Sequence, residues 1–168
     1  DKITKMNASG EYAKRLQSYG NGIILVSQGI PFIHAGAEFG RSKNMDHNSY
    51  KTAGDINNIK WGLKKSNNDI FKYYQGMIAM RKAHPAFRFT TKRDIEANVK
   101  TSGYNGAVVV DINGAAAGDS WKQIKLVINS GNNLTIGGVD GWKKKVNGVT
   151  VNTDGTDGNA TAEGTAVT

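Results

Sequence analysis

The stretch that decides how this 168-residue chain is interpreted is Gln28-Gly29-Ile30-Pro31-Phe32-Ile33-His34-Ala35-Gly36-Ala37-Glu38-Phe39. Its apolar part, 30–33, is short, rich in β-favouring residues and bounded by turn residues. Such a run is typical of a strand that is buried on both faces of a parallel sheet. Pro31 fits this interpretation because a missing backbone N–H is tolerated near the first residue of a strand. We therefore predict a buried parallel strand that needs strands at both edges and helices on both faces.

Amphipathic helices are predicted on both sides of this strand. Upstream, apolar residues recur at helical spacing from Tyr12 to Val26, with Ser9 as the N-cap and Gly29 just beyond the end. Downstream, a second helix is predicted to begin after Asn67 and to end at His84-Pro85, because proline disfavours helical backbone in the residue before it. The predicted buried face of the second helix comprises Ile70, Tyr74, Met77, Ile78 and Arg81.

A long polar segment, 40–65, separates the predicted strand from the second helix. Loops longer than about 12–15 residues inside a compact domain are usually functional or disordered. Tyr50, Ile56, Ile59 and Trp61 favour an ordered loop, because these large apolar and aromatic side chains can pack. The segment is therefore the first place to look for a binding site.

From about residue 92 the helical periodicity ends and short β-candidates follow. They are 107–112, 125–129, 134–136, 142–146 and 149–152. Asn-Gly, Asn-Asn and Asp-Gly pairs separate them, which predicts an antiparallel β-sandwich. The stretch 153–168 reads as a strand that is cut short. The fold class is thus α/β plus all-β, with a boundary between 1–91 and 92–168; the alternative is one small α+β domain in which strand 30–33 pairs with the β-module.

Composition excludes several function classes. The chain has no cysteine, which excludes disulfides, thiolate zinc sites and cysteine nucleophiles. It has no apolar run near the roughly 20 residues that span a membrane. Its net charge is +8, but the basic residues are scattered, and the densest run, 143–145, is interpreted as a solvated edge strand rather than a nucleic-acid site. The three histidines share no metal-ligand spacing, so no metal site is predicted.

Further motifs follow the opening stretch in a fixed order. They are Arg-Ser-Lys at 41–43, Asp-His-Asn-Ser-Tyr at 46–50, Asn-Asn-Ile-x-Trp at 57–61, Met-Arg-Lys-Ala-His-Pro-Ala-Phe-Arg at 80–88, Gly-Asp-Ser-Trp-Lys at 118–122 and Val-Ile-Asn at 127–129. Residues 28–39 resemble the eighth barrel strand of the α-amylase family, and His-Ala-Gly-x-Glu-Phe at 34–39 resembles its type I pullulanase branch. Together the motifs cover nearly the whole chain, and their order is more specific than any one of them.

The resemblance implies a fold as well as a family. Residues 1–91 would be the C-terminal part of a (β/α)8 TIM barrel, comprising its seventh helix, eighth strand, long loop and eighth helix. Residues 92–168 would be the C-terminal antiparallel β-sandwich without its last strand. The loop 40–65 would then lie at the C-terminal face, where barrels carry their active sites. The sequence departs from the branch at Lys51, where Asn is common, at Ala53-Gly54, which replaces a Pro-bearing turn, and at Lys60, which replaces Asp before Trp61.

The resemblance also implies an activity, which is hydrolysis of α-1,6 branch linkages in pullulan and starch-type glucans with retention of configuration. Retaining glycosidases need two carboxyl groups about 5–5.5 Å apart. In the family, the three catalytic acids lie on barrel strands upstream of this segment, so the chain alone is predicted to be inactive and no catalytic residue is assigned. We interpret Glu38 as an acid that binds backbone or arginine at the base of the loop, and His34 as a hydrogen-bonded core histidine.

The candidate substrate-binding residues all lie in the loop, because sugar recognition combines flat rings with directed hydrogen bonds. They are Arg41, Asp46, His47, Asn48, Tyr50 and Asp55. The alternative is that these side chains tie down their own loop, with Trp61 as its hydrophobic anchor. For Asp46, Asn48 and Tyr50 the two interpretations are balanced, because long loops at this face of a barrel often serve both purposes.

The expected partners are an α-glucan, such as pullulan, amylopectin or a limit dextrin, and the remainder of the barrel. No cofactor is expected, although Ca²⁺ in the longer protein is allowed by the resemblance. A secreted or cell-surface bacterial protein is expected, with a cytoplasmic one as the alternative. Two other functions stay open: a non-catalytic carbohydrate-binding or cell-surface module that uses Trp121 and Trp142, and a basic nucleic-acid-binding domain, which no motif supports.

Overall fold

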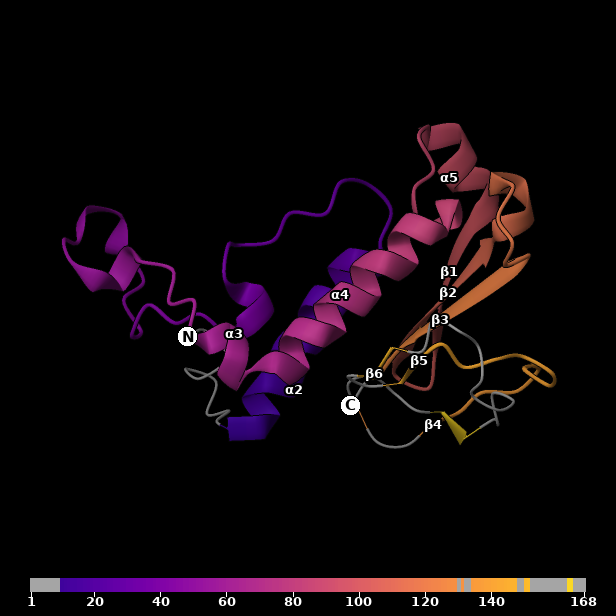
Figure 1. Ribbon diagram of the computed structural model, residues 1–168. Coiled ribbons are helices and arrows are strands. Elements are labelled where there is room, and N and C mark those ends of the chain that lie inside the picture. The colour runs from indigo at the N-terminus through magenta and orange to yellow at the C-terminus, as the bar shows by residue number, and fades with distance from the viewer. Residues whose placement is uncertain (1–9, 130, 132–133, 148–149, 152–162, 165–168) are drawn as a thin grey trace.

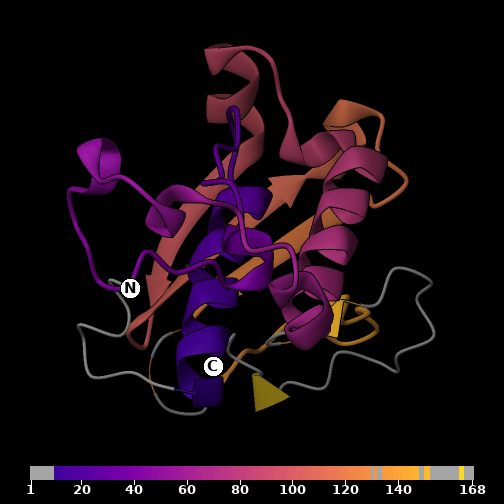
Figure 2. The same ribbon diagram turned by 60° about the vertical axis from the view of Figure 1, so that its left-hand side comes forward.

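Two long helices, α2 (Gly10–Val26) and α4 (Asn68–Ala83), lie on one face of a three-stranded antiparallel sheet (Figures 1 and 2). The structure is a computed structural model that describes residues 10–129, 131, 134–147, 150–151 and 163–164. Both helices were predicted from their periodicity, and the predicted end at His84-Pro85 is confirmed. The predicted N-cap, Ser9, lies outside the described residues.

The helix pair packs closely because α2 carries a glycine at the crossing. A Cβ on Gly22 would lie 2.2 Å from the Tyr73 hydroxyl, so a larger residue would require the Tyr73 side chain to move. The buried face of α4 includes Tyr73, Tyr74, Met77 and Met80. Ile78, which was predicted to be on this face, is 42% exposed, so that part of the prediction is wrong.

A buried arginine joins the end of α2 to α4. The Arg81 guanidinium donates to the carbonyl oxygens of Leu25 (2.9 Å), Ser27 (2.7 Å) and Gly29 (2.6 Å). Helix ends leave carbonyl groups without partners in the helix, and a cation suits their partial negative charge. Burial lowers the pKa of Arg81 from its ordinary value, and the nearby Arg88 charge lowers it further.

The predicted strand over 30–33 is not a strand in this structure. It pairs with no described strand, and Ile30 and Phe32 are 97% and 88% exposed. Ile33 alone of these apolar side chains packs against the core. A strand is defined by the hydrogen bonds of its neighbours, and the described residues supply none at either edge.

The sheet consists of β1 (Val99–Tyr104), β2 (Ala107–Asn113) and β3 (Gln123–Ile128), in that order. The predictions of β2 and β3 are confirmed within two residues at each end. Strand β1 was missed, although the turn that joins it to β2 is Asn105-Gly106, with φ of 47° and 83°. Positive φ at both positions is the geometry of a tight hairpin turn, for which Asn-Gly is the preferred pair.

Strand β2 is covered on both faces. Val110 and Ile112 face the helices in one hydrophobic cluster, together with Ile124 and Leu126 of β3. Ala107 and Val109 face the other way, against Leu134, Ile136 and Val139. The alternation follows from the two-residue period of a strand. The helices and the segment 134–139 therefore form separate layers on either side of the sheet.

A short helix, α5 (Lys92–Asn98), lies where helical structure was predicted to have ended. Its start follows a capping pattern: the Thr91 hydroxyl oxygen accepts from the Asp94 N–H at 3.1 Å, and the hydroxyl donates to the Asp94 carboxylate at 2.6 Å. Thr-x-x-Asp is a local signal for a helix start. Seven residues are too few to show periodicity, which explains why the helix was missed.

The remaining elements are short. Strand β4 (Leu134–Thr135) pairs with β7 (Glu163–Gly164), and β5 (Val146–Asn147) pairs with β6 (Thr150–Val151). The other helical turns are η1 (Ala37–Phe39), η2 (Ser49–Lys51), η3 (Asp55–Asn57), α3 (Leu63–Ser66), η4 (Pro85–Phe87) and η5 (Gly114–Ala117). Of the predicted strand 142–146 only Val146 is in β5, so the lysines 143–145 do not form the predicted edge strand. Among the described helices, none has the length and apolarity to cross a membrane.

The close approach at Gly114 generates a stability prediction. A Cβ on Gly114 would lie 1.9 Å from the Trp121 carbonyl oxygen, so Gly114→Ala must displace backbone. We expect a loss of about 2 kcal/mol in the free energy of unfolding, measured by chemical denaturation. Gly137→Ala is the matched control, since a Cβ there meets nothing within 4 Å, and it should change stability little. Equal effects of the two substitutions would contradict the packing argument.

Candidate functional site

The base of the loop 40–65 is held by Arg41 against a glycine. Gly36 has a φ of 91°, and a Cβ there would lie 2.6 Å from the Arg41 side chain. The Arg41 guanidinium donates to the Ala35 carbonyl oxygen at 3.1 Å and also to the carbonyl oxygen of Asn57. Arg41 therefore connects the start of the loop to a residue 16 positions later. Arg41, one of the six candidate binding residues, is therefore engaged with backbone carbonyl groups.

The centre of the loop is organised by Asn57, which belongs to the 57–61 motif but was not among the candidate binding residues. Its amide nitrogen donates to the carbonyl oxygens of Ser49 (2.8 Å) and Thr52 (2.9 Å). Its side-chain oxygen accepts from the Ser49 hydroxyl (3.0 Å) and from the Lys43 ammonium (3.1 Å). Ser49 is buried, with 4% of its surface exposed. The loop is therefore ordered by a polar network rather than by a hydrophobic core.

A second local network surrounds Asp46. One carboxylate oxygen accepts from the Asn48 N–H at 2.8 Å and the other from the Thr52 hydroxyl at 3.2 Å. This bond from the N–H two residues on is the Asx turn that aspartate commonly forms. Asp46 thus shapes the turn that carries its neighbours, and both of its oxygens are engaged in doing so.

The other four candidates, His47, Asn48, Tyr50 and Asp55, are exposed. Tyr50 is 71% exposed, with the Lys51 ammonium 5.3 Å from its ring centroid. Asp55 accepts from the Asn58 side chain at 2.9 Å. Figure 1 shows the loop extending to the left of the helix pair, on the side opposite the sheet. The structure thus distinguishes candidate residues that stabilise the loop, such as Arg41 and Asp46, from candidate residues whose side chains are exposed to solvent.

Aromatic packing anchors the end of the loop. The Trp61 ring centroid lies 5.7 Å from that of the buried Phe39, and 67% of Trp61 stays exposed. Glu38 accepts from the Gly36 N–H at 3.0 Å, which confirms its interpretation as an acid that binds backbone at the base of the loop. His34 is exposed, so its interpretation as a core histidine is wrong. Residues 30–34 pair with no described strand.

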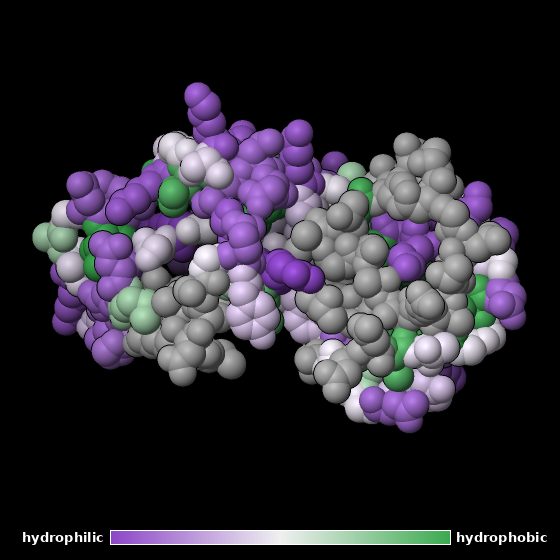
Figure 3. Space-filling view, turned by 90° about the horizontal axis from the view of Figure 1, so that it is seen from below, coloured by the Kyte–Doolittle hydropathy of each residue, from purple (hydrophilic) through white to green (hydrophobic). Residues whose placement is uncertain are grey.

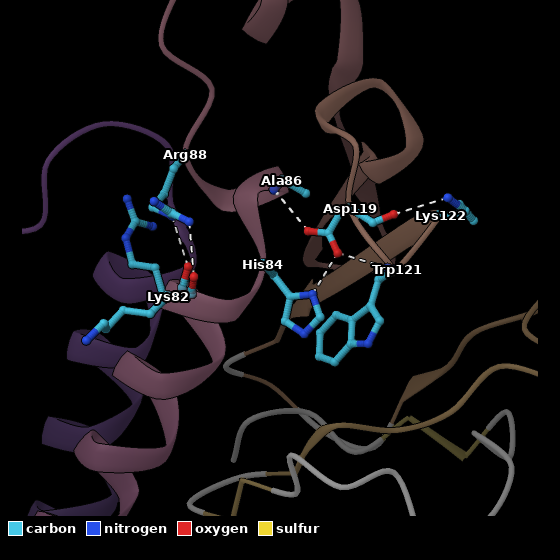
Figure 4. Close-up of polar contacts among 8 residues, drawn as sticks. Lys82, His84, Ala86, Arg88, Asp119, Trp121 and Lys122 are labelled. Atoms are coloured by element: carbon cyan, nitrogen blue, oxygen red, sulfur yellow. Dashed lines mark hydrogen bonds and ion pairs between the residues drawn. The ribbon is translucent and has the colours of Figure 1, made fainter.

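A second polar cluster lies where α4 meets the sheet (Figure 4). The Asp119 carboxylate is 2.7 Å from Nδ1 of His84 and accepts from the N–H groups of Trp121 (2.8 Å) and Ala86 (3.1 Å). The Trp121 ring is stacked on His84 with a centroid separation of 3.5 Å. Two sequence motifs, 80–88 and 118–122, therefore meet at one buried carboxylate. His84 and Asp119 are 35 residues apart in the sequence, so no local pattern indicated that they would be in contact.

The charge of Asp119 is held in place by these bonds. Burial by itself raises the pKa of a carboxyl group, but the hydrogen bonds from His84, Trp121 and Ala86 outweigh it and hold the pKa of Asp119 below its ordinary value. The side chain is fully buried. Both of its oxygens are engaged, so the cluster joins α4 to the β-module. Across the described residues, no group of three or more His, Asp or Glu side chains could hold a metal ion.

Comparison with known proteins shows which proteins this chain is similar to. No family model matches the sequence. A curated pullulanase of Bacillus subtilis is 41% identical over 78 residues, which is 46% of this chain and 11% of the relative. A curated isoamylase of a Flavobacterium species is 30% identical over 131 residues, covering 66% of this chain and 17% of the relative. Both are debranching glycoside hydrolases.

A solved structure agrees with these relatives. The pullulanase of Paenibacillus barengoltzii in complex with maltohexaose and α-cyclodextrin is 34% identical and superposes with a TM-score of 0.72, covering 77% of this chain and 20% of that one. The resemblance to the pullulanases is therefore confirmed over most of the chain. The chain spans between about a tenth and a fifth of the lengths of these three proteins, so it corresponds to a part of them.

The network at Asn57 generates a prediction about loop order. Asn57→Ala removes four hydrogen bonds within the loop, so trypsin should cleave after Lys51 and Lys60 several-fold faster. The adjacent Asn58→Ala is the control, because its side chain bonds the exposed Asp55 and should leave the cleavage rate unchanged. Unchanged cleavage in the Asn57 variant would mean that the loop is ordered by other contacts.

The Asp119 cluster generates a prediction about acid stability. Because the folded-state pKa is lowered, the carboxylate stabilises the fold above the ordinary aspartate pKa of about 3.9, and this contribution is lost as pH falls toward the folded value. We expect Asp119→Asn to cost about 2 kcal/mol of unfolding free energy at pH 7, and less as the pH falls below 4. Asp140 is exposed, so Asp140→Asn is the control and should change the unfolding free energy little. A pH-independent loss would show that charge is not what matters at Asp119.

Proposed function

We propose that this chain is part of a pullulanase-like glycoside hydrolase that cleaves α-1,6-glucosidic branch linkages in pullulan and starch-type glucans with retention of configuration. The observation that carries the proposal is the ordered loop 40–65, which presents an exposed tyrosine and hydroxyl-binding groups in a chain that matches a pullulanase over 77% of its length. A solved relative is in complex with maltohexaose and α-cyclodextrin, which supports a glucan as the substrate.

The proposal includes the position of the chain in the longer fold. Residues 1–91 would form the last helices, strand and loop of a (β/α)8 barrel, and 92–168 the C-terminal β-sandwich. The near-complete exposure of Ile30 and Phe32 supports this, since a barrel strand would cover both side chains with neighbouring strands and helices. The Asp119 cluster would then join the last barrel helix to the sandwich.

Within the loop, the six candidate residues would act in two ways. Tyr50 would stack on the apolar face of a sugar ring, while His47, Asn48 and Asp55 would hydrogen-bond its hydroxyl groups. Arg41 and Asp46 would contribute by holding the loop in shape. The catalytic carboxyl groups would come from other parts of the barrel, so the chain alone would not hydrolyse pullulan.

Other expectations belong to the same proposal. The partners would be the α-glucan and the remainder of the barrel, and a secreted or cell-surface location would suit an enzyme acting on polymeric glucan, with the cytoplasm as the alternative. A non-catalytic binding module centred on Trp121 and Trp142 is not favoured. Trp121 is stacked on His84, and Trp142 packs against the cluster of Val109 and Leu134.

The proposed role of Tyr50 can be tested on the chain itself by affinity electrophoresis in gels that contain pullulan. A stacking ring contributes about 1 kcal/mol, so Tyr50→Ala should weaken retention about fivefold. Tyr104, which is 45% exposed at the end of β1, is the matched control, and Tyr104→Ala should be retained like the parent chain. Undiminished retention of the Tyr50 variant would contradict a sugar contact, and pullulan hydrolysis by the chain alone would contradict its proposed inactivity.

A further inference from the structure

The net charge of the chain is concentrated in the candidate loop. Residues 40–65 contain six Lys and Arg and two Asp, a net charge of +4 in 26 residues, whereas the whole chain has +8 in 168. Half of the excess positive charge therefore lies in less than a sixth of the sequence. In the view from below, hydrophilic residues lie among hydrophobic ones on the left of the molecule, where the loop lies (Figure 3).

Only some of these charged side chains make hydrogen bonds within the loop. Arg41 and Lys43 donate hydrogen bonds to groups within it, Arg41 to the Asn57 carbonyl oxygen and Lys43 to the side chains of Ser49 and Asn57. Both carboxylates are engaged locally, since Asp46 accepts from Asn48 and Thr52, and Asp55 accepts from Asn58. The other four cations, Lys51, Lys60, Lys64 and Lys65, are exposed. The loop therefore presents positive charge to the solvent while its negative charge takes part in its turns.

Two of these lysines flank exposed aromatic rings. The Lys51 ammonium is 5.3 Å from the ring centroid of its neighbour Tyr50. Lys60 directly precedes Trp61, which is 67% exposed. The first pair places a ring that can stack on a sugar near an ammonium group that can bind an anion, and in the second pair the lysine is the neighbour of the ring residue in the sequence. Lys51 and Lys60 are also two of the positions at which the sequence departs from the branch that it resembles.

We propose that the loop binds an α-glucan that carries phosphate monoester groups, with Lys51 and Lys60 as the phosphate-binding residues. The inference rests on the proposed function, because it specifies the substrate class of the same site. A phosphate monoester carries about −1.5 to −2 charges at pH 7 and accepts hydrogen bonds at three oxygens. Lysine binds phosphate as a flexible point charge, which suits esters at variable positions along a polymer. A neutral glucan would leave these ammonium groups without an anion.

The test compares retention of the full 168-residue chain in gels containing phosphorylated amylopectin with retention in the same polymer after phosphatase treatment. We expect retention about fivefold stronger on the phosphorylated polymer at roughly 20 mM salt. The difference should disappear at about 0.5 M salt, because exposed charges are screened at that ionic strength. Heparin, a polyanion that is not an α-glucan, serves as a competitor and should compete poorly.

Two double variants distinguish phosphate binding by Lys51 and Lys60 from a general effect of the net charge of the chain. The double variant Lys51→Asn with Lys60→Asp lowers the charge by three and should abolish the preference for phosphorylated polymer. The double variant Lys100→Asn with Lys92→Asp lowers it equally, at exposed positions on β1 and α5 that lie across the molecule from the loop, and should keep the preference (Figure 1). Circular dichroism verifies that each variant is folded.

The possible outcomes distinguish a failure of the inference from a failure of the proposed function. Equal retention on both polymers overturns the inference and leaves the proposed function standing. No retention on either polymer overturns both. A preference lost equally in the two double variants, or removed by heparin as readily as by phosphorylated amylopectin, shows diffuse charge attraction and overturns the inference.

Discussion

The buried carboxylate of Asp119 is the contact on which the arrangement of this molecule depends. It accepts hydrogen bonds from His84 and from the N–H groups of Ala86 and Trp121, and thereby fixes the end of α4 against the loop that enters β3. A buried charge is tolerated only when its oxygens are satisfied, and here two backbone groups and an imidazole satisfy them. Because α4 is placed by this contact, its apolar face meets β2 and β3 in one core.

Helix α4 in turn positions everything on its other side. Arg81 holds the end of α2 through three carbonyl oxygens, and Asn67, just before α4, donates to the Phe39 carbonyl oxygen at 3.0 Å. The loop 40–65 therefore starts and ends on a rigid helix, while its interior is ordered by short-range polar bonds around Asn57 and Asp46. This division suits a binding loop, because a rigid base fixes where the exposed side chains lie.

Resemblance and structure contribute different parts of the functional argument. The relatives are two pullulanases and an isoamylase, and the chain corresponds to a small part of each. The structure distinguishes loop residues that are engaged, such as Arg41, from those that are presented, such as Tyr50. It also shows that four lysines of the loop, Lys51, Lys60, Lys64 and Lys65, are exposed.

The sequence alone determined the two long helices and strands β2 and β3, because their periodicity is local and repeats over many residues. It missed α5 and β1, whose signals, Thr91-x-x-Asp94 and Asn105-Gly106, are only a few residues long. It misplaced Ile30 and His34, because burial depends on neighbours that residues 30–34 do not encode. Only the tertiary structure decided that His84 meets Asp119 and that Asn57 organises the loop, since side-chain hydrogen bonds between distant residues leave no periodic pattern in a sequence.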